Sequence, residues 1–241
     1  GSYAFSGCTM LKEINFSDSV TTINSFAFEN CTALTSVNIP GNVQTIYEGA
    51  FYGCSGLRTL ILNEGLNTIK GQAFMGCPIT SLVIPDSVNT IDVYYPSYQT
   101  WHGAFEGCKN IKTVTLPEGL TWIESSTFKN CSNLETVSLP ESLKHISSNA
   151  FSGCTNLKNV TIPKGVTSMY AHAFSDCTSI ESIEVPSITL LDAGTFYNCE
   201  NLKNVVISNG LLEIGYMVFG GCTSLERVTY PAGLIDFGYK Q

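Results

Sequence analysis

Ten cysteines and three histidines are the residues of this chain whose types could support metal binding, disulfides or nucleophilic catalysis. Zinc sites use close pairs such as C-x-x-C, whereas the two nearest cysteines here are 22 residues apart. The histidines, His102, His145 and His172, lack the H-x-x-x-H spacing of a helical metal site. A G-x-S-x-G nucleophile elbow and a phosphate-binding glycine loop are also absent. We therefore expect no catalytic residues, no metal and no cofactor.

The cysteines recur at a nearly constant interval. They are Cys8, Cys31, Cys54, Cys77, Cys108, Cys131, Cys154, Cys177, Cys199 and Cys222, with gaps of 23, 23, 23, 31, 23, 23, 23, 22 and 23 residues. Self-similarity at such a period is typical of a solenoid. Side chains in register on stacked coils run parallel instead of converging, which disfavours disulfides. We expect a ladder of buried, reduced thiols that act as small hydrophobes.

A short turn is predicted to position each cysteine. A phenylalanine stands three residues before every cysteine, as Phe51 does before Cys54. The residue directly before the cysteine is Gly, Asn or Asp, as at Gly53, Asn130 and Asp176. These residue types tolerate the left-handed conformation that ends a short helical turn.

A strand is predicted after each cysteine. In CTNLKNVTIP, the alternation of Val160 and Ile162 indicates one buried strand face, and Pro163 ends the segment because it cannot extend the ladder. The next apolar residues, Val166 and Met169, are three apart and are expected to point inward on the return side of the coil. One coil cannot bury these side chains alone, but stacked coils form a continuous core.

The pattern resembles the leucine-rich repeats of the BspA type, A-F-x-[GN]-C-x-x-L-x-x-[VI]-x-[IL]-P, in ten successive matches over essentially the whole chain. The resemblance implies an α/β-type repeat solenoid, a right-handed superhelix with a parallel β-sheet on its concave face and short turns or helical segments on the return side. Residues 1–241 are expected to form a single solenoid domain of about ten coils, a fragment of a longer chain because both ends fall within a coil. Many members of this family are surface or secreted proteins of host-associated microbes that act in adhesion, which implies an extracellular or cell-surface location.

Composition narrows the class of partner. The net charge of −8 argues against nucleic acid, whose recognition needs a basic face. The sequence contains no cluster of Lys or Arg that could bind an anionic membrane surface. It also contains no run of about 18 apolar residues that could span a bilayer. We expect a monomer whose partner is a protein or glycan, such as host extracellular matrix.

The outward positions of the predicted strands form columns. One column alternates in charge and predicts a ladder of ion pairs: Lys112, Glu135, Lys158, Glu181, Lys203 and Glu226. Its neighbour is short and polar: Ser36, Thr59, Ser81, Thr113, Thr136, Asn159, Ser182 and Asn204. Such a face could bind an extended protein or glycan, although Thr-rich strands need no ligand to explain them.

Residues 92–103, DVYYPSYQTWHG, interrupt the repeat with nine extra residues. They must loop outward because the interior of a solenoid has no room. Tyr94, Tyr95, Tyr98 and Trp101 are the predicted binding residues, since Tyr and Trp combine contact area with a polar tip. The alternative is that these rings fold back over the coils as a local lid.

The sequence thus favours a binding or adhesion module that displays a rigid surface. A passive spacer, with the active part in flanking domains, is the competing interpretation. A third hypothesis, an enzyme with a site at His102, requires an acid or nucleophile close to that residue.

Overall fold

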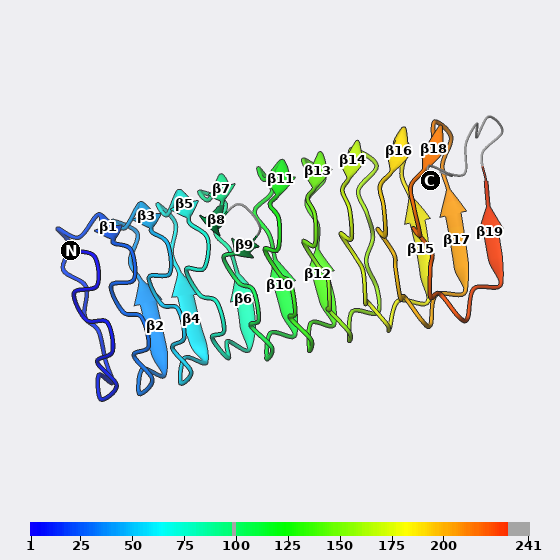
Figure 1. Ribbon diagram of the computed structural model, residues 1–241. Helices are drawn as coiled ribbons and strands as arrows, with labels where there is room; N and C mark the ends of the chain where they lie inside the picture. Colours follow the sequence, from blue (N-terminus) through cyan, green and yellow to red (C-terminus); the bar gives the residue numbers. More distant parts are fainter. Residues whose placement is uncertain (98–99, 231–241) are drawn as a thin grey trace.

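The computed structural model describes residues 1–97 and 100–230 and shows coils stacked in a single row (Figure 1). Each regular coil contains a long strand, a tight turn, a two-residue strand and the turn that carries Phe and Cys. All strand pairs between coils are parallel, as stacking of equivalent segments requires. The predicted fold class, a leucine-rich-repeat solenoid, is confirmed.

The long strands form the sheets on one side of the stack. They are β2 (Ser36–Ile39), β4 (Thr59–Leu62), β6 (Ser81–Val83), β10 (Thr113–Thr115), β12 (Thr136–Ser138), β15 (Ser182–Val185), β17 (Asn204–Ile207) and β19 (Arg227–Thr229). Their register pairs Ser36 with Thr59 and Ser182 with Asn204, so the predicted polar column is confirmed. The long strands are divided into separate sheets between β4 and β6 and between β12 and β15. At the second division, residues 159–162 form no regular strand, and an isolated bridge joins Asn159 to Thr136.

A second set of strands, only two residues long, lies on the return side. These are β1 (Thr22–Ile23), β3 (Thr45–Ile46), β5 (Thr68–Ile69), β7 (Thr90–Ile91), β11 (Trp122–Ile123), β13 (His145–Ile146), β14 (Ser168–Met169), β16 (Leu190–Leu191) and β18 (Glu213–Ile214). The sequence predicted turns or helical segments here, and within the described residues the return side has turns and strands but no helix. The reason is local, because β-branched Thr-Ile pairs favour an extended backbone.

The core is a row of phenylalanine rings with a row of thiols beside it. Consecutive rings from Phe28 to Phe219 stack with their centroids between 5.2 Å and 5.8 Å apart. Each thiol from Cys31 to Cys222 donates to the carbonyl of a phenylalanine in the preceding coil, as Cys54 Sγ does to Phe28 O at 3.1 Å. The inward positions predicted from the sequence, including Val160, Ile162, Val166 and Met169, are buried.

Two residues in most coils adopt the left-handed conformation. One is the predicted residue before cysteine, for example Asn130 with φ 60° and Asp176 with φ 58°. The other, two residues before phenylalanine, was not predicted and includes Phe26, with φ 57°, and His172, with φ 59°. In the described part of the chain, no helix is long and apolar enough to cross a membrane.

Candidate binding surface

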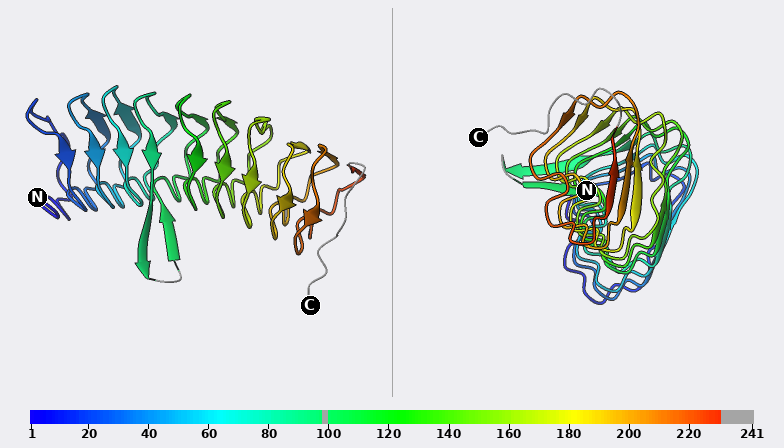
Figure 2. Two further views of the ribbon diagram at one scale, coloured as in Figure 1. Left: turned by 90° about the horizontal axis from the view of Figure 1, so that it is seen from above. Right: turned by 90° about the vertical axis from the view of Figure 1, so that its right-hand side faces the viewer.

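The inserted residues form a β-hairpin that stands out from the side of the stack. Its strands are β8 (Val93–Ser97) and β9 (Thr100–Gly103), which pair antiparallel, with Tyr94 opposite His102. Figure 2 shows the green hairpin projecting away from the coils at the point where β7 ends. The regular repeat resumes directly afterwards, since Ala104 and Phe105 are buried in the core. The insertion therefore adds a protrusion while the core continues past it, although the short-strand sheet is divided here, with β7 and β11 in separate sheets.

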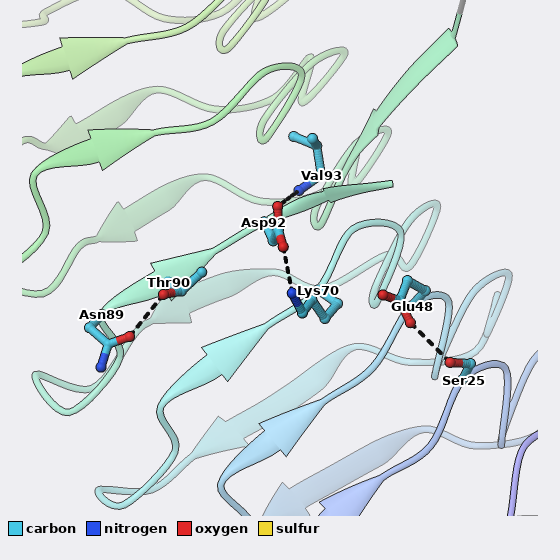
Figure 3. A network of polar contacts seen from close by, with 7 residues as sticks. All are labelled: Ser25, Glu48, Lys70, Asn89, Thr90, Asp92 and Val93. Atoms are coloured by element: carbon cyan, nitrogen blue, oxygen red, sulfur yellow. Dashed lines mark hydrogen bonds and ion pairs between the residues drawn. The ribbon is translucent and has the colours of Figure 1, made fainter. Parts of the chain in front are cut away.

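A polar network fixes the base of the hairpin (Figure 3). Asp92 accepts a hydrogen bond from the Val93 backbone N–H at Oδ1, 2.8 Å away, and its Oδ2 lies 2.6 Å from Lys70 Nζ in the preceding coil. The ion pair with Asp92 raises the pKa of Lys70. Gly71 lies against the hairpin so closely that a Cβ there would overlap the backbone of Val93 and Tyr94. The first strand of the hairpin is thus seated on the coil that contains residues 68–77.

The four predicted binding residues do not share one position or one degree of exposure. Tyr94 is half-buried, and its ring meets Phe26 edge-to-face at 6.2 Å, over the coils that precede the hairpin. Tyr95 and Trp101 are 56% and 45% exposed, and their rings meet edge-to-face at 5.2 Å. Tyr98 lies outside the described residues. Tyr94 therefore has the position expected of a lid, whereas Tyr95 and Trp101 present a shared aromatic surface to solvent.

Carboxylates lie near the exposed rings. Burial and the nearby charges of Glu124 and Asp92 raise the pKa of Tyr95. Burial and then Asp92 raise the pKa of Glu124. One side of the hairpin base is therefore acidic, and Lys70 compensates only part of that charge through its pair with Asp92.

A polar hollow lies where β9 meets the following coils. It has a volume of about 310 Å³ and is lined by Trp101, His102, Glu106, Ser125, Ser126, Lys129, Ser148 and Asn149. His102 Nδ1 is 2.9 Å from Glu106 Oε2, and the Glu106 side chain is only 9% exposed. The acid that a catalytic site at His102 would need is therefore present. Within the described residues, however, no serine or cysteine hydrogen bonds to the His102 ring.

The outer face of the short strands carries an aromatic cluster that the sequence reasoning missed. Trp122 and His145 occupy equivalent positions on β11 and β13, and their ring centroids are 4.0 Å apart. Tyr170 stacks on Trp122 at 6.2 Å. The signal in the sequence was the residue before each return-side Ile, which is Thr in four earlier coils and Trp or His here. Because these segments were expected to be turns or helical, the column was not recognised as outward-facing.

The long-strand face offers a shallow groove instead of an ion-pair ladder. Among the described residues of the predicted ladder, one pair is within ion-pair distance, Lys203 Nζ and Glu181 Oε2 at 3.2 Å, and both are exposed. A hollow of about 900 Å³ opens at the interrupted strand and includes Asn159, Thr161, Lys164 and Glu184. On its described strands this face is mostly polar, and its large exposed apolar side chains are Ile61 and Val83, on the neighbouring strands β4 and β6, and Val206 on β17.

The cysteines form no reactive centre in the described structure. The eight from Cys31 to Cys199 are buried free thiols, as predicted, while Cys8 is exposed and Cys222 is half-buried. Burial raises the pKa of Cys108 to about 12, and that of Cys31 to about 11. Over the residues that the structure describes, no three His, Cys, Asp or Glu side chains are grouped to hold a metal ion.

The sequence matches the family model described as the BspA type leucine rich repeat region, over residues 1–101, 100–202 and 189–241. Among solved structures, it is similar to a leucine-rich repeat protein from Bacteroides ovatus, with 30% identity and a TM-score of 0.60. That match covers 93% of this chain and 68% of the other. Among curated proteins, none matches the sequence.

Two further solved structures are similar. A leucine rich cell surface protein from Faecalibacterium prausnitzii is 28% identical with a TM-score of 0.59, covering 96% of this chain and 69% of that one. A leucine-rich repeat protein from T. pallidum is 27% identical with a TM-score of 0.59, covering 76% of this chain and 78% of that one.

Proposed function

The chain belongs to the BspA-type leucine-rich repeat family, and on this premise we propose that it is a binding module at a bacterial cell surface or in the extracellular space. In this role it holds a rigid surface toward a protein or glycan, such as a component of host extracellular matrix, and makes or breaks no bond. The description of the Faecalibacterium relative as a cell surface protein supports the location.

The projecting hairpin is the observation that supports this role most strongly. Regular coils bury most of their phenylalanine rings in a continuous row, whereas Tyr95 and Trp101 are 56% and 45% exposed on a protruding element. Exposed Trp and Tyr are the residue types that dominate binding energy when a partner covers them. Their edge-to-face contact holds each ring in place before binding, which lowers the entropy lost on association.

The test compares the intact chain with the double variant Tyr95→Ser and Trp101→Ser. Neither side chain belongs to the buried core, so this variant keeps the fold, whereas deletion of the hairpin would remove the buried Val93. The matched control is the double variant Trp122→Ser and Tyr216→Ser, which removes the same two residue types elsewhere on the surface. Binding to a panel of matrix proteins and glycans is measured by surface plasmon resonance.

Loss of at least tenfold in affinity in the hairpin variant alone would support the proposal. Equal binding by all three proteins would contradict it and direct attention to the long-strand face. The competing role is a passive spacer that holds flanking domains away from the cell. Under that alternative, none of the three proteins binds any member of the panel.

A further inference from the structure

The hollow beside β9 combines an aromatic ring with several polar side chains. Trp101 and His102 contribute from the hairpin, Glu106 from the turn after it, and the other residues from the next two coils. Its volume of about 310 Å³ is at the lower end of the range of small-molecule sites, which begins near 300 Å³. The space therefore suits one small ring and is too small for an extended chain.

The Trp101 ring gives this hollow an apolar wall. Trp101 is held by its edge-to-face contact with Tyr95, with an angle of 69° between the ring planes. It is still 45% exposed, so part of the indole remains available to a ligand. An aromatic face is negatively polarised and attracts the weakly positive C–H groups of a saturated ring.

The polar wall contains both donors and acceptors. Glu106 is buried and its Oε2 is paired with His102, but an ionised carboxylate has about four acceptor positions, so capacity remains for a ligand. Lys129 supplies donors only, and the Asn149 amide supplies both kinds. Ser125, Ser126 and Ser148 add hydroxyl groups that can either donate or accept a hydrogen bond.

The opposite charges of Lys129 and Glu106 disfavour a ligand that carries a single charge. A free amine or a lysine side chain would meet Lys129, and a phosphate would meet the buried Glu106 carboxylate. A ring that carries several hydroxyl groups satisfies both, because each hydroxyl can donate to Glu106 and accept from Lys129. We propose that this hollow binds a single pyranose residue at the end of a glycan, stacked on Trp101 and hydrogen bonded to Glu106, Lys129 and Asn149.

This inference rests on the proposed function, since it names the ligand class for the same hairpin region. It is tested with methyl glycosides of hexoses, N-acetylhexosamines, uronic acids and sialic acid, using saturation-transfer NMR and then calorimetry for those that bind. Two variants alter the hollow without touching the exposed rings of the hairpin: Lys129→Ala and the shape-conserving Glu106→Gln. Lys158→Ala, an exposed lysine on the long-strand face, is the matched control. Circular dichroism melting establishes that each variant is folded.

We expect at least one glycoside to bind the intact protein, with affinity at least tenfold lower in Lys129→Ala and unchanged in Lys158→Ala. Absence of saturation transfer with every glycoside would overturn the inference, as would binding that Lys129→Ala and Glu106→Gln leave intact. If a protein partner binds through Tyr95 and Trp101 while no glycoside binds, the hollow proposal fails and the proposed function stands. If a glycoside binds in the hollow with the expected loss in Lys129→Ala, while no member of the matrix panel binds the intact protein, the hollow proposal stands and the proposed function fails.

Discussion

Asp92 and Lys70 join the hairpin to the coil before it. The Asp92 carboxylate uses one oxygen for Lys70 Nζ, at 2.6 Å, and the other for the Val93 backbone N–H, at 2.8 Å. The side chain that follows the buried Ile91 therefore fixes both the position and the direction in which β8 leaves the stack (Figure 3). The exposed rings further along the hairpin depend on that base for their orientation.

Asp92→Ala is expected to loosen the hairpin while leaving the solenoid folded. The substitution removes a partly exposed ion pair and one charge-assisted hydrogen bond, so the global free energy of unfolding should fall by only about 1–2 kcal/mol. Hydrogen exchange measured by mass spectrometry should show faster exchange in β8 and β9 than in the neighbouring strands. Asp18→Ala, at an exposed position in the first coils, is the control. Unchanged exchange in the hairpin would show that Gly71 and Tyr94 alone seat it.

Gly71→Ala tests that seating directly. A Cβ at Gly71 would overlap the backbone of Val93 and Tyr94, and backbone cannot rotate away as a flexible side chain can. We expect the hairpin to shift, the Tyr94 contact with Phe26 to be lost and the melting temperature to fall by several degrees. At Gly119, by contrast, an added Cβ meets open space, so Gly119→Ala should melt like the parent protein. Similar melting of the two variants would contradict this account of the hairpin base.

The periodic part of the fold was predictable because each coil repeats the same physical constraints. Phe three residues before Cys, and the Val160 to Ile162 alternation, identify inward positions that the structure places in the core. The return side was harder to predict, because two residues such as Thr45–Ile46 are too few to show a strand period. Their strand character arises from pairing with equivalent residues of adjacent coils, which a single repeat does not reveal.

The candidate site was only partly predictable. The insertion and its aromatic residues stand out in the sequence, but the sequence does not state that Tyr94 turns back toward Phe26 while Tyr95 and Trp101 remain exposed. The pairing of His102 with Glu106 was also missed. A separation of four residues brings two side chains together in a helix, but this segment was not expected to be helical. The turn that follows Gly103, in which the Glu106 N–H donates to the Gly103 carbonyl, brings them together instead. Such contacts depend on the local turn geometry.

Glu124 is expected to make stability depend on pH. Burial and the nearby Asp92 raise its pKa, so the folded state binds the Glu124 proton more tightly than the unfolded state does. Stability from this group is therefore present at low pH and is lost as the pH rises from the ordinary carboxyl pKa through the raised one. The amide of Glu124→Gln does not titrate, so the variant does not lose this stability. It should therefore become more stable than the parent protein as the pH increases.

Urea unfolding at a series of pH values between about 4 and 8 measures this difference. The difference between parent and variant should shrink toward acid, where the Glu124 carboxyl is protonated and resembles the amide. Glu118→Gln, at an exposed position of the same coil, provides the control. A difference that stays constant with pH would mean that Glu124 is not held in an unfavourable environment.

The cysteines should react in two separate groups. Cys8 is exposed and Cys222 is half-buried, whereas the eight cysteines between them are buried. Burial raises the pKa of most of these eight thiols. The thiolate is the reactive form, so alkylation is slowed both by lack of access and by the low thiolate fraction. Intact mass measurement after iodoacetamide treatment should show up to two additions in the native protein and ten in urea. Rapid native labelling of more than two thiols would contradict the buried ladder.

Phe151→Ala should be among the most damaging single substitutions in the solenoid. The Phe151 ring is fully buried and stacks on Phe128 at 5.5 Å and on Phe174 at 5.2 Å, so its removal leaves a cavity between two coils. Burial of this kind predicts a loss of about 3–5 kcal/mol in the free energy of unfolding. The matched control is Phe5→Ala, because Phe5 is 47% exposed and stacks on Phe28 alone, in the first coil.

Urea denaturation followed by circular dichroism measures both variants of the phenylalanine row. In a solenoid each coil is stabilised chiefly by its neighbours, so a cavity at Phe151 weakens two interfaces whereas the loss of Phe5 weakens one. We therefore expect the midpoint of Phe151→Ala to fall well below that of Phe5→Ala, and the unfolding curve to broaden if the two halves of the stack separate. Equal midpoints would mean that the coils are stabilised mainly by their strands and turns, with the ring stack contributing little.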